Sequence, residues 1–116
     1  MVIIDESLLA KYRGLQIDGE PDFVDRLIGV FLAESPGRME RLRAALSTGD
    51  RDGLHNVSHT MKSSAALVGA TSLAAVCRTL DELSQGDGPS TALAKGVTRV
   101  MREYELAAQA LSAISA

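Results

Sequence analysis

The chain has few residues that could cross-link it or supply large aromatic side chains to a core. Among its 116 residues there is one cysteine, no tryptophan, two phenylalanines and two tyrosines. Because a single cysteine cannot form a disulfide within the chain, we interpret Cys77 as a small buried thiol in a reducing compartment. With so few aromatic side chains, the core must consist of Leu, Ala, Val, Ile and Met, which favours packed helices over a sheet.

Long runs of one residue type are also missing. There is no stretch of about 18 apolar residues, and residues 1–6 lack a basic segment followed by a long apolar one. The net charge is -3 and no cluster of Lys and Arg occurs, whereas nucleic acid is bound mainly by clustered cations. We therefore expect a cytoplasmic protein, or the cytoplasmic part of one, with no nucleic-acid partner and no membrane partner.

The remaining composition is that of an ordinary globule. Hydrophobic residues make up 46% and charged residues 23% of the chain, which excludes wholesale disorder. Folded domains commonly have about 100–150 residues. We therefore expect residues 1–116 to form a single domain. The initial Met and the short ends favour a free-standing protein over a domain of a larger kinase.

Apolar residues recur every three or four positions through most of the chain, which is the spacing of a buried helical stripe. This periodicity predicts a short helix at about 5–13 and longer helices at about 22–34, 36–46, 50–69, 71–83 and 90–114. Pro36 is expected to end one helix and begin the next. Residues 84–89, Ser-Gln-Gly-Asp-Gly-Pro, predict a flexible loop.

Several residues are suited to helix ends. Glu20-Pro21-Asp22 is expected to open the first long helix, and Asp50 to cap the fourth in chain order. Gly69 is expected to end that helix in a left-handed conformation, and Thr71 or Ser72 to cap the next. No sustained alternation of apolar and polar residues indicates a strand. The sequence thus predicts an all-α fold, an up-down-up-down four-helix bundle with one or two additional short helices.

His59 lies on the solvent side of the predicted helix at 50–69. At about 100° per residue, it lies roughly 160° from the centre of the buried stripe. That stripe consists of Leu54, Val57, Met61, Ala65 and Val68. Small residues share the outward face with His59, namely Asn56, Ser63 and Ala66. We therefore expect the imidazole to stand clear of its neighbours, with Lys62 close enough to lean towards it.

An exposed imidazole beside a lysine is suited to carrying a phosphoryl group. The unperturbed pKa of an imidazole is about 6.5, so much of it is a neutral nucleophile at cytoplasmic pH. A phosphoryl group on the ring would carry a charge of roughly -2. The ammonium of Lys62 could pair with its oxygens. Small neighbours would let another protein's active site reach the ring.

The segment from 58 to 70 reads Ser-His-Thr-Met-Lys-Ser-Ser-Ala-Ala-Leu-Val-Gly-Ala. It resembles the motif of histidine-containing phosphotransfer (HPt) domains, His-x-Leu-Lys-Gly-Ser-Ser followed by Gly-Ala. The positions that match in type and register are His59, Lys62, Ser64, Gly69 and Ala70. Met61 replaces Leu, Ser63 stands where Gly is usual, and Ala65 stands where the second Ser is usual. Residues 21–46 also resemble the helix pair that precedes the phosphohistidine helix in that family.

The resemblance implies a phosphoryl carrier of a multistep two-component phosphorelay rather than an independent enzyme. His59 would accept the phosphoryl group from a receiver-domain phosphoaspartate or a sensor histidine kinase and pass it to another receiver. Lys62 would stabilise the phosphate. The chain would need no cofactor of its own, since Mg²⁺ is expected on the partner receiver domain. A monomer is expected, because a carrier must present an open face.

The remaining site residues divide into two groups. Five are candidates for docking of the partner, namely His55, Asn56, Ser63, Ala66 and Leu67. Four belong to the structural part of the motif, namely Met61, Ser64, Gly69 and Ala70. Compared with the usual glycine, serine at position 63 would leave less space for a docking partner but would stabilise the helix. Glycine weakens a helix by up to about 1 kcal/mol relative to alanine.

Two other interpretations stay open. The chain could be a non-catalytic helical protein-binding module whose histidine face only recognises a partner. His55 and His59, four residues apart, could also hold a metal along one helix face, but two ligands make an incomplete site. We therefore expect no metal, and place His55 on the surface at the rim of the docking face.

Overall fold

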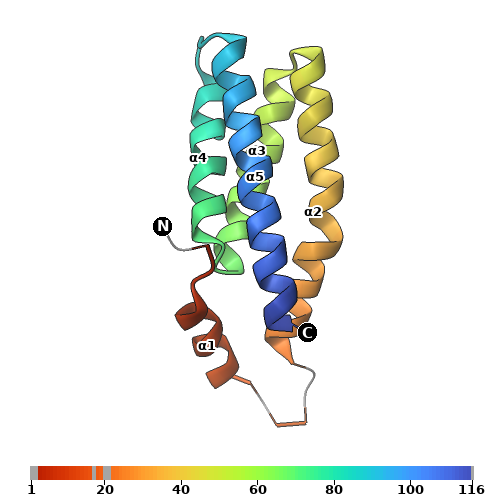
Figure 1. The fold of residues 1–116 in the computed structure, drawn as a ribbon, viewed down its shortest axis with the longest axis vertical. Helices are drawn as coiled ribbons and strands as arrows, with labels where there is room; N and C mark the ends of the chain where they lie inside the picture. Colours follow the sequence, from red (N-terminus) through yellow and green to blue (C-terminus); the bar gives the residue numbers. More distant parts are fainter. Residues whose placement is uncertain (1–2, 17, 20–21, 116) are drawn as a thin grey trace.

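The computed structural model describes residues 3–16, 18–19 and 22–115 of the chain. It contains five helices, α1 (Glu6–Gly14), α2 (Phe23–Thr48), α3 (Arg51–Leu67), α4 (Thr71–Gln85) and α5 (Ser90–Ser115). The described residues contain no strand. The four long helices form a bundle with the short α1 beside one end of it, which confirms the predicted all-α class (Figure 1).

Each long helix of the bundle lies antiparallel to the next in the chain (Figure 1). Helix α2 packs against α3, α3 against α4, α4 against α5, and α5 closes the ring by packing against α2. Short connections at residues 49–50, 68–70 and 86–89 place each long helix beside the next one in the chain. Helix α1 packs against α2.

The core of the bundle is aliphatic, as the composition predicts. Within the part of the chain that the structure describes, Phe31 is the only aromatic side chain in the buried core. Among the described residues the core consists mainly of Leu, Val, Ile, Met and Ala. Cys77 is buried in it, and burial raises the pKa of the thiol to about 12. The prediction of a small buried thiol is therefore confirmed.

Helix α2 runs without a break through Pro36, so the predicted end of a helix at this residue was wrong. Proline has no N–H to donate within the helix, but its ring is exposed here and faces away from the core. Phe31 and Met39, on either side of it, are both buried. The hydroxyl of Ser35 also donates to the carbonyl of Phe31 at 2.6 Å. Packing of the residues on both sides of Pro36 thus outweighs the tendency of proline to interrupt a helix.

Two of the three predicted N-terminal helix caps are confirmed. Asp22 caps α2 by accepting from the N–H of Asp25 at 3.1 Å, and Asp50 caps α3 by accepting from Gly53 at 2.9 Å. Glu20 and Pro21 lie outside the described residues. Helix α4 begins after Ala70, with no side-chain cap, so a cap by Thr71 or Ser72 was a wrong prediction. Ala70 is fully buried, and a position packed into the core favours a small apolar residue over a polar cap.

Gly69 makes the turn between α3 and α4, as predicted. Its φ of 76° is left-handed, and the N–H of Ala70 donates back to the carbonyl of Ala65 at 2.8 Å. The carbonyl of Gly69 accepts from the N–H of Asp5 at 2.7 Å. A Cβ on Gly69 would lie 3.0 Å from the carbonyl oxygen of Asp5. The turn therefore also anchors the N-terminal segment.

Two glycines allow this anchoring to be tested. Gly49, at φ 70°, is also left-handed, but a Cβ there would meet nothing within 4 Å. We expect Gly49→Ala to lower the free energy of unfolding by about 1–2 kcal/mol through backbone strain alone. Gly69→Ala should lower it further, since Asp5 must also move. Chemical denaturation of both variants measures the difference, and equal losses would contradict the anchoring.

Candidate functional site

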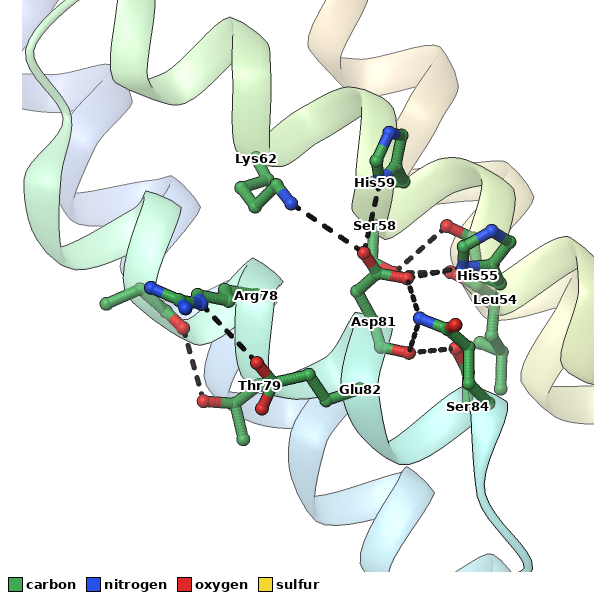
Figure 2. Close-up of polar contacts among 12 residues, drawn as sticks. Leu54, His55, Ser58, His59, Lys62, Arg78, Thr79, Asp81, Glu82 and Ser84 are labelled. Carbon is green, nitrogen blue, oxygen red and sulfur yellow. Dashed lines mark hydrogen bonds and ion pairs between the residues drawn. The ribbon is translucent and has the colours of Figure 1, made fainter.

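His59 projects from the exposed side of α3, next to α4. Its side chain is 58% exposed, and its Nδ1 lies 3.1 Å from Oδ2 of Asp81 on α4. Figure 2 shows the Asp81 carboxylate between the two helices, with the imidazoles of His59 and His55 both turned towards it. The expectation that His59 stands clear of its neighbours was therefore wrong, because a partner from the adjacent helix holds one of its ring nitrogens.

Asp81 is a buried charge with both oxygens occupied. Its side chain is only 7% exposed. Oδ1 contacts Nδ1 of His55 and accepts from Nε2 of Gln85 at 3.2 Å. Oδ2 contacts His59 and lies 3.9 Å from Nζ of Lys62. Three hydrogen-bonding side chains and one longer ion pair thus surround the two oxygens of Asp81.

The surroundings of Asp81 keep it ionised. Burial raises the pKa of this carboxyl, but hydrogen bonds from His59 and His55, together with their charges, outweigh burial and hold the pKa below its usual value. An ionised carboxylate can only accept hydrogen bonds. Both imidazoles must therefore carry a hydrogen on Nδ1, which leaves Nε2 of a neutral His59 ring with a free lone pair.

Lys62 reaches the same carboxylate rather than the ring of His59. Its side chain is 33% exposed, and its ammonium forms an ion pair with Asp81. The sequence predicts that this lysine lies near His59, one turn along the helix. The structure adds that Asp81 is the group they share, which leaves the ammonium within the site and partly open to solvent.

The predicted docking residues differ in their exposure. Asn56, Ser63, Ala66 and Leu67 are all exposed, Leu67 to 50%. His55 is half-buried, with 37% of its side chain exposed, and its contact with Asp81 places it inside the site rather than only at its rim. A groove of about 490 Å³ between α2 and α3 runs past Asn56. Docking by these residues stays a prediction.

The structural part of the motif is buried or half-buried. Met61 and Ala70 are fully buried, and Gly69 is buried in its turn. Ser64 is half-buried, where its hydroxyl accepts from Nη1 of Arg38 on α2 at 3.4 Å. These residues therefore fix α3 against its neighbours.

Two residues that the sequence analysis did not single out complete the site. One is Asp81. The sequence signal for it was an acidic residue at the helical spacing of buried positions, because Cys77, Leu80 and Ser84 on the same helix are all buried. The other is Arg51, whose Nη1 donates to the carbonyl of Gly86 at 2.8 Å. This bond ties the start of α3 to the end of α4 and so supports the position of Asp81 between the helices.

Over residues 26–114, most of the chain, the sequence matches the family described as the Hpt domain. This chain belongs to the Hpt domain family. Hpt domains are phosphotransfer modules of phosphorelays. Neither the curated proteins nor the solved structures gave a match. The family assignment agrees with the resemblance seen in residues 58–70, and the helical bundle is the fold expected for an Hpt domain.

The described part of the Hpt domain has neither a membrane-spanning helix nor a cluster of metal-ligating side chains. Within the described ranges, no helix is both long and apolar enough to cross a membrane. Among the same residues, no three His, Cys, Asp or Glu side chains are arranged to hold a metal ion. His55 and His59 instead share the Asp81 carboxylate.

The lowered pKa of Asp81 predicts how stability depends on pH. Ionised Asp81 should stabilise the fold above the ordinary aspartate pKa of about 3.9, and this stabilisation should be lost as the pH falls through the lower folded-state pKa. At pH 7, Asp81→Asn should reduce the free energy of unfolding by about 1–3 kcal/mol. The difference from the wild type should shrink towards pH 2 in chemical denaturation.

Glu82→Gln is the matched control for this experiment. Glu82 is the next residue on α4, and its side chain is 67% exposed in a surface pair with Arg78. Exposed pairs contribute little, so this variant should stay within about 0.5 kcal/mol of the wild type. A loss in Asp81→Asn that did not change with pH would show that the charge of Asp81 has no stabilising role.

Proposed function

We propose that His59 accepts a phosphoryl group on Nε2 from a receiver-domain phosphoaspartate, or from a sensor histidine kinase, and passes it to another receiver aspartate. The observation that carries the proposal is the contact between Nδ1 of His59 and the buried Asp81. It directs Nε2 away from the carboxylate, on a side chain that is 58% exposed (Figure 2). A partner could reach this nitrogen from solvent.

The chemistry needs no acid or base from this chain. The Nε2 lone pair attacks phosphorus, the bond from phosphorus to the donor's carboxylate oxygen breaks, and the donor aspartate leaves as an anion. The ring then carries a positive charge, with its hydrogen still on Nδ1. Asp81 lies 3.1 Å from that nitrogen and offsets the developing charge. In the onward step the receiver carboxylate attacks phosphorus, and neutral imidazole leaves.

Lys62 supports the phosphorylated state. Its ammonium is 3.9 Å from Asp81, longer than a charged hydrogen bond, so it is not held tightly there. With a phosphoryl group on Nε2, the flexible side chain can turn outward and pair with phosphate oxygens. Lys62 thus adds a cation where the negative charge arrives, while Asp81 keeps its contact with the ring.

The partners follow from this chemistry. Receiver domains would supply the reacting aspartate and its Mg²⁺, so the Hpt domain would act as a carrier without a cofactor of its own. The exposed side chains of Asn56, Ser63, Ala66 and Leu67 form the surface around His59 that such a partner would cover. A monomer and a cytoplasmic location stay predictions.

Replacement of His59 tests the proposal. In His59→Asn the side-chain amide can still donate to Asp81 but has no nitrogen in place of Nε2. We expect a phosphorylated receiver to transfer acid-labile, alkali-stable label to the wild type and none to this variant. Circular dichroism would check that both are folded. Undiminished label in the variant, or no label on the wild type with any receiver of its own cell, would overturn the proposal.

The same variant distinguishes a relay from the alternative binding module. A module whose histidine face only recognises a receiver would bind it more weakly in the variant and would take up no phosphate with either residue at position 59. Binding measured by calorimetry, alongside the label, separates the two functions.

Lys62→Gln tests the role of the lysine. Loss of one charge-assisted hydrogen bond to the phosphate should slow transfer to His59 by about tenfold, while Lys62→Arg should retain most of the rate. Lys95→Gln is the control, because Lys95 is an exposed cation on α5, which does not pack against α3. Equal rates for Lys62→Gln and Lys95→Gln would show that Lys62 does not assist transfer.

A further inference from the structure

We propose that His55 is a positioning residue for phosphotransfer. It fixes the orientation of the Asp81 carboxylate, and the carboxylate in turn orients the ring of His59. This inference rests on the function proposed above. The sequence assigned His55 to the docking surface, four residues before His59. The structure instead gives the two histidines equivalent contacts with opposite oxygens of one buried carboxylate, His55 with Oδ1 and His59 with Oδ2.

The geometry makes the two contacts interdependent. The rings project from successive turns of α3 with centroids 5.6 Å apart, and both present Nδ1 to Asp81 (Figure 2). A carboxylate is planar, so an oxygen fixed by His55 also fixes the direction of the other oxygen. The contact with His55 therefore fixes the plane of the carboxylate, and Oδ2 can accept from Nδ1 of His59 only in that plane.

The other groups around the carboxylate cannot replace His55. Gln85 also donates to Oδ1, at 3.2 Å, but this side chain belongs to an exposed residue on the same helix as Asp81 and does not link α4 to α3. Lys62 is a competing cation 3.9 Å from Oδ2. Without His55 we expect the carboxylate to rotate towards the ammonium, which would lengthen its contact with His59.

The charged groups near His55 support this role. Asp81 is the acid that faces it from α4, and His59 and Lys62 follow it on α3. Arg51, one turn before it, donates to the carbonyls of Leu83 and Gly86 at the end of α4. The cation nearest in sequence is therefore engaged with the backbone, so that His55 is the donor from α3 that meets Oδ1.

Two substitutions separate the donor of His55 from its bulk. In His55→Asn the side-chain amide nitrogen can take the place of Nδ1 and keep the hydrogen bond to Oδ1. In His55→Leu the bulk is retained and the donor is lost. Phosphorylation of His59 by phosphoramidate, from which ammonia leaves as the phosphorus–nitrogen bond breaks, requires no protein partner. This donor therefore excludes any effect of His55 on docking.

We expect His55→Leu to slow phosphorylation of His59 by about tenfold, and His55→Asn to stay within about threefold of the wild type. Mass spectrometry of peptides would assign the label to position 59. Equal rates for the Leu and Asn variants would overturn the positioning role. Label at position 55 of the wild type would also overturn it, since His55 would then be an acceptor.

A spectroscopic signature tests the same inference without phosphate. Imidazole ¹⁵N shifts above pH 8 should show His59 as the Nδ1–H tautomer in the wild type and in His55→Asn, and as a mixture of tautomers in His55→Leu. An unchanged tautomer in His55→Leu would contradict the inference. If receivers fail to label the wild type, the proposed relay fails, while the tautomer measurement still decides the contact between His55, Asp81 and His59.

Discussion

The site depends on one buried carboxylate. Removing a carboxylate from water is strongly unfavourable unless its oxygens are paired, and Asp81 is only 7% exposed. Its partners come mainly from α3, so the charge is satisfied only when the two helices are in the correct register. The pairing with α3 that offsets the cost of burying Asp81 also fixes the ring of His59. The stability of the fold and the orientation of the His59 ring therefore have a common origin.

The register between α3 and α4 is secured on both sides of Asp81. At one end the two helices are joined through the tight turn at Gly69, whose carbonyl also receives the N–H of Asp5. At the other end Arg51 bonds to the carbonyl of Gly86. A slip of one helix along the other would break both connections as well as the contacts of the carboxylate. Among the described residues, the site is thus held by helix packing and these hydrogen bonds, with no disulfide.

The sequence predicted features that depend on local pattern. The exposure of His59, the Asp50 cap and the turn at Gly69 all follow from spacing within one helix or from the preference of one residue. The contact with Asp81 did not follow, because it joins residues on two helices and depends on how those helices face each other. Pro36 was misjudged for a related reason, since burial of its neighbours on α2 outweighs its local preference. An aspartate at core spacing on α4 was the available signal for a buried site.

The geometry also limits what serine in place of the usual glycine at position 63 can affect. Asp81 holds the ring of His59 through Nδ1, on the side of α3 that faces α4. Ser63 is exposed, one turn beyond His59, and is not among the side chains that contact this carboxylate, which are His55, His59, Lys62 and Gln85. Ser63 therefore makes no direct contribution to the contact that orients the ring of His59. The serine can instead change the stability of α3. Under the proposed function, it would also occupy space on the exposed face that a partner would cover.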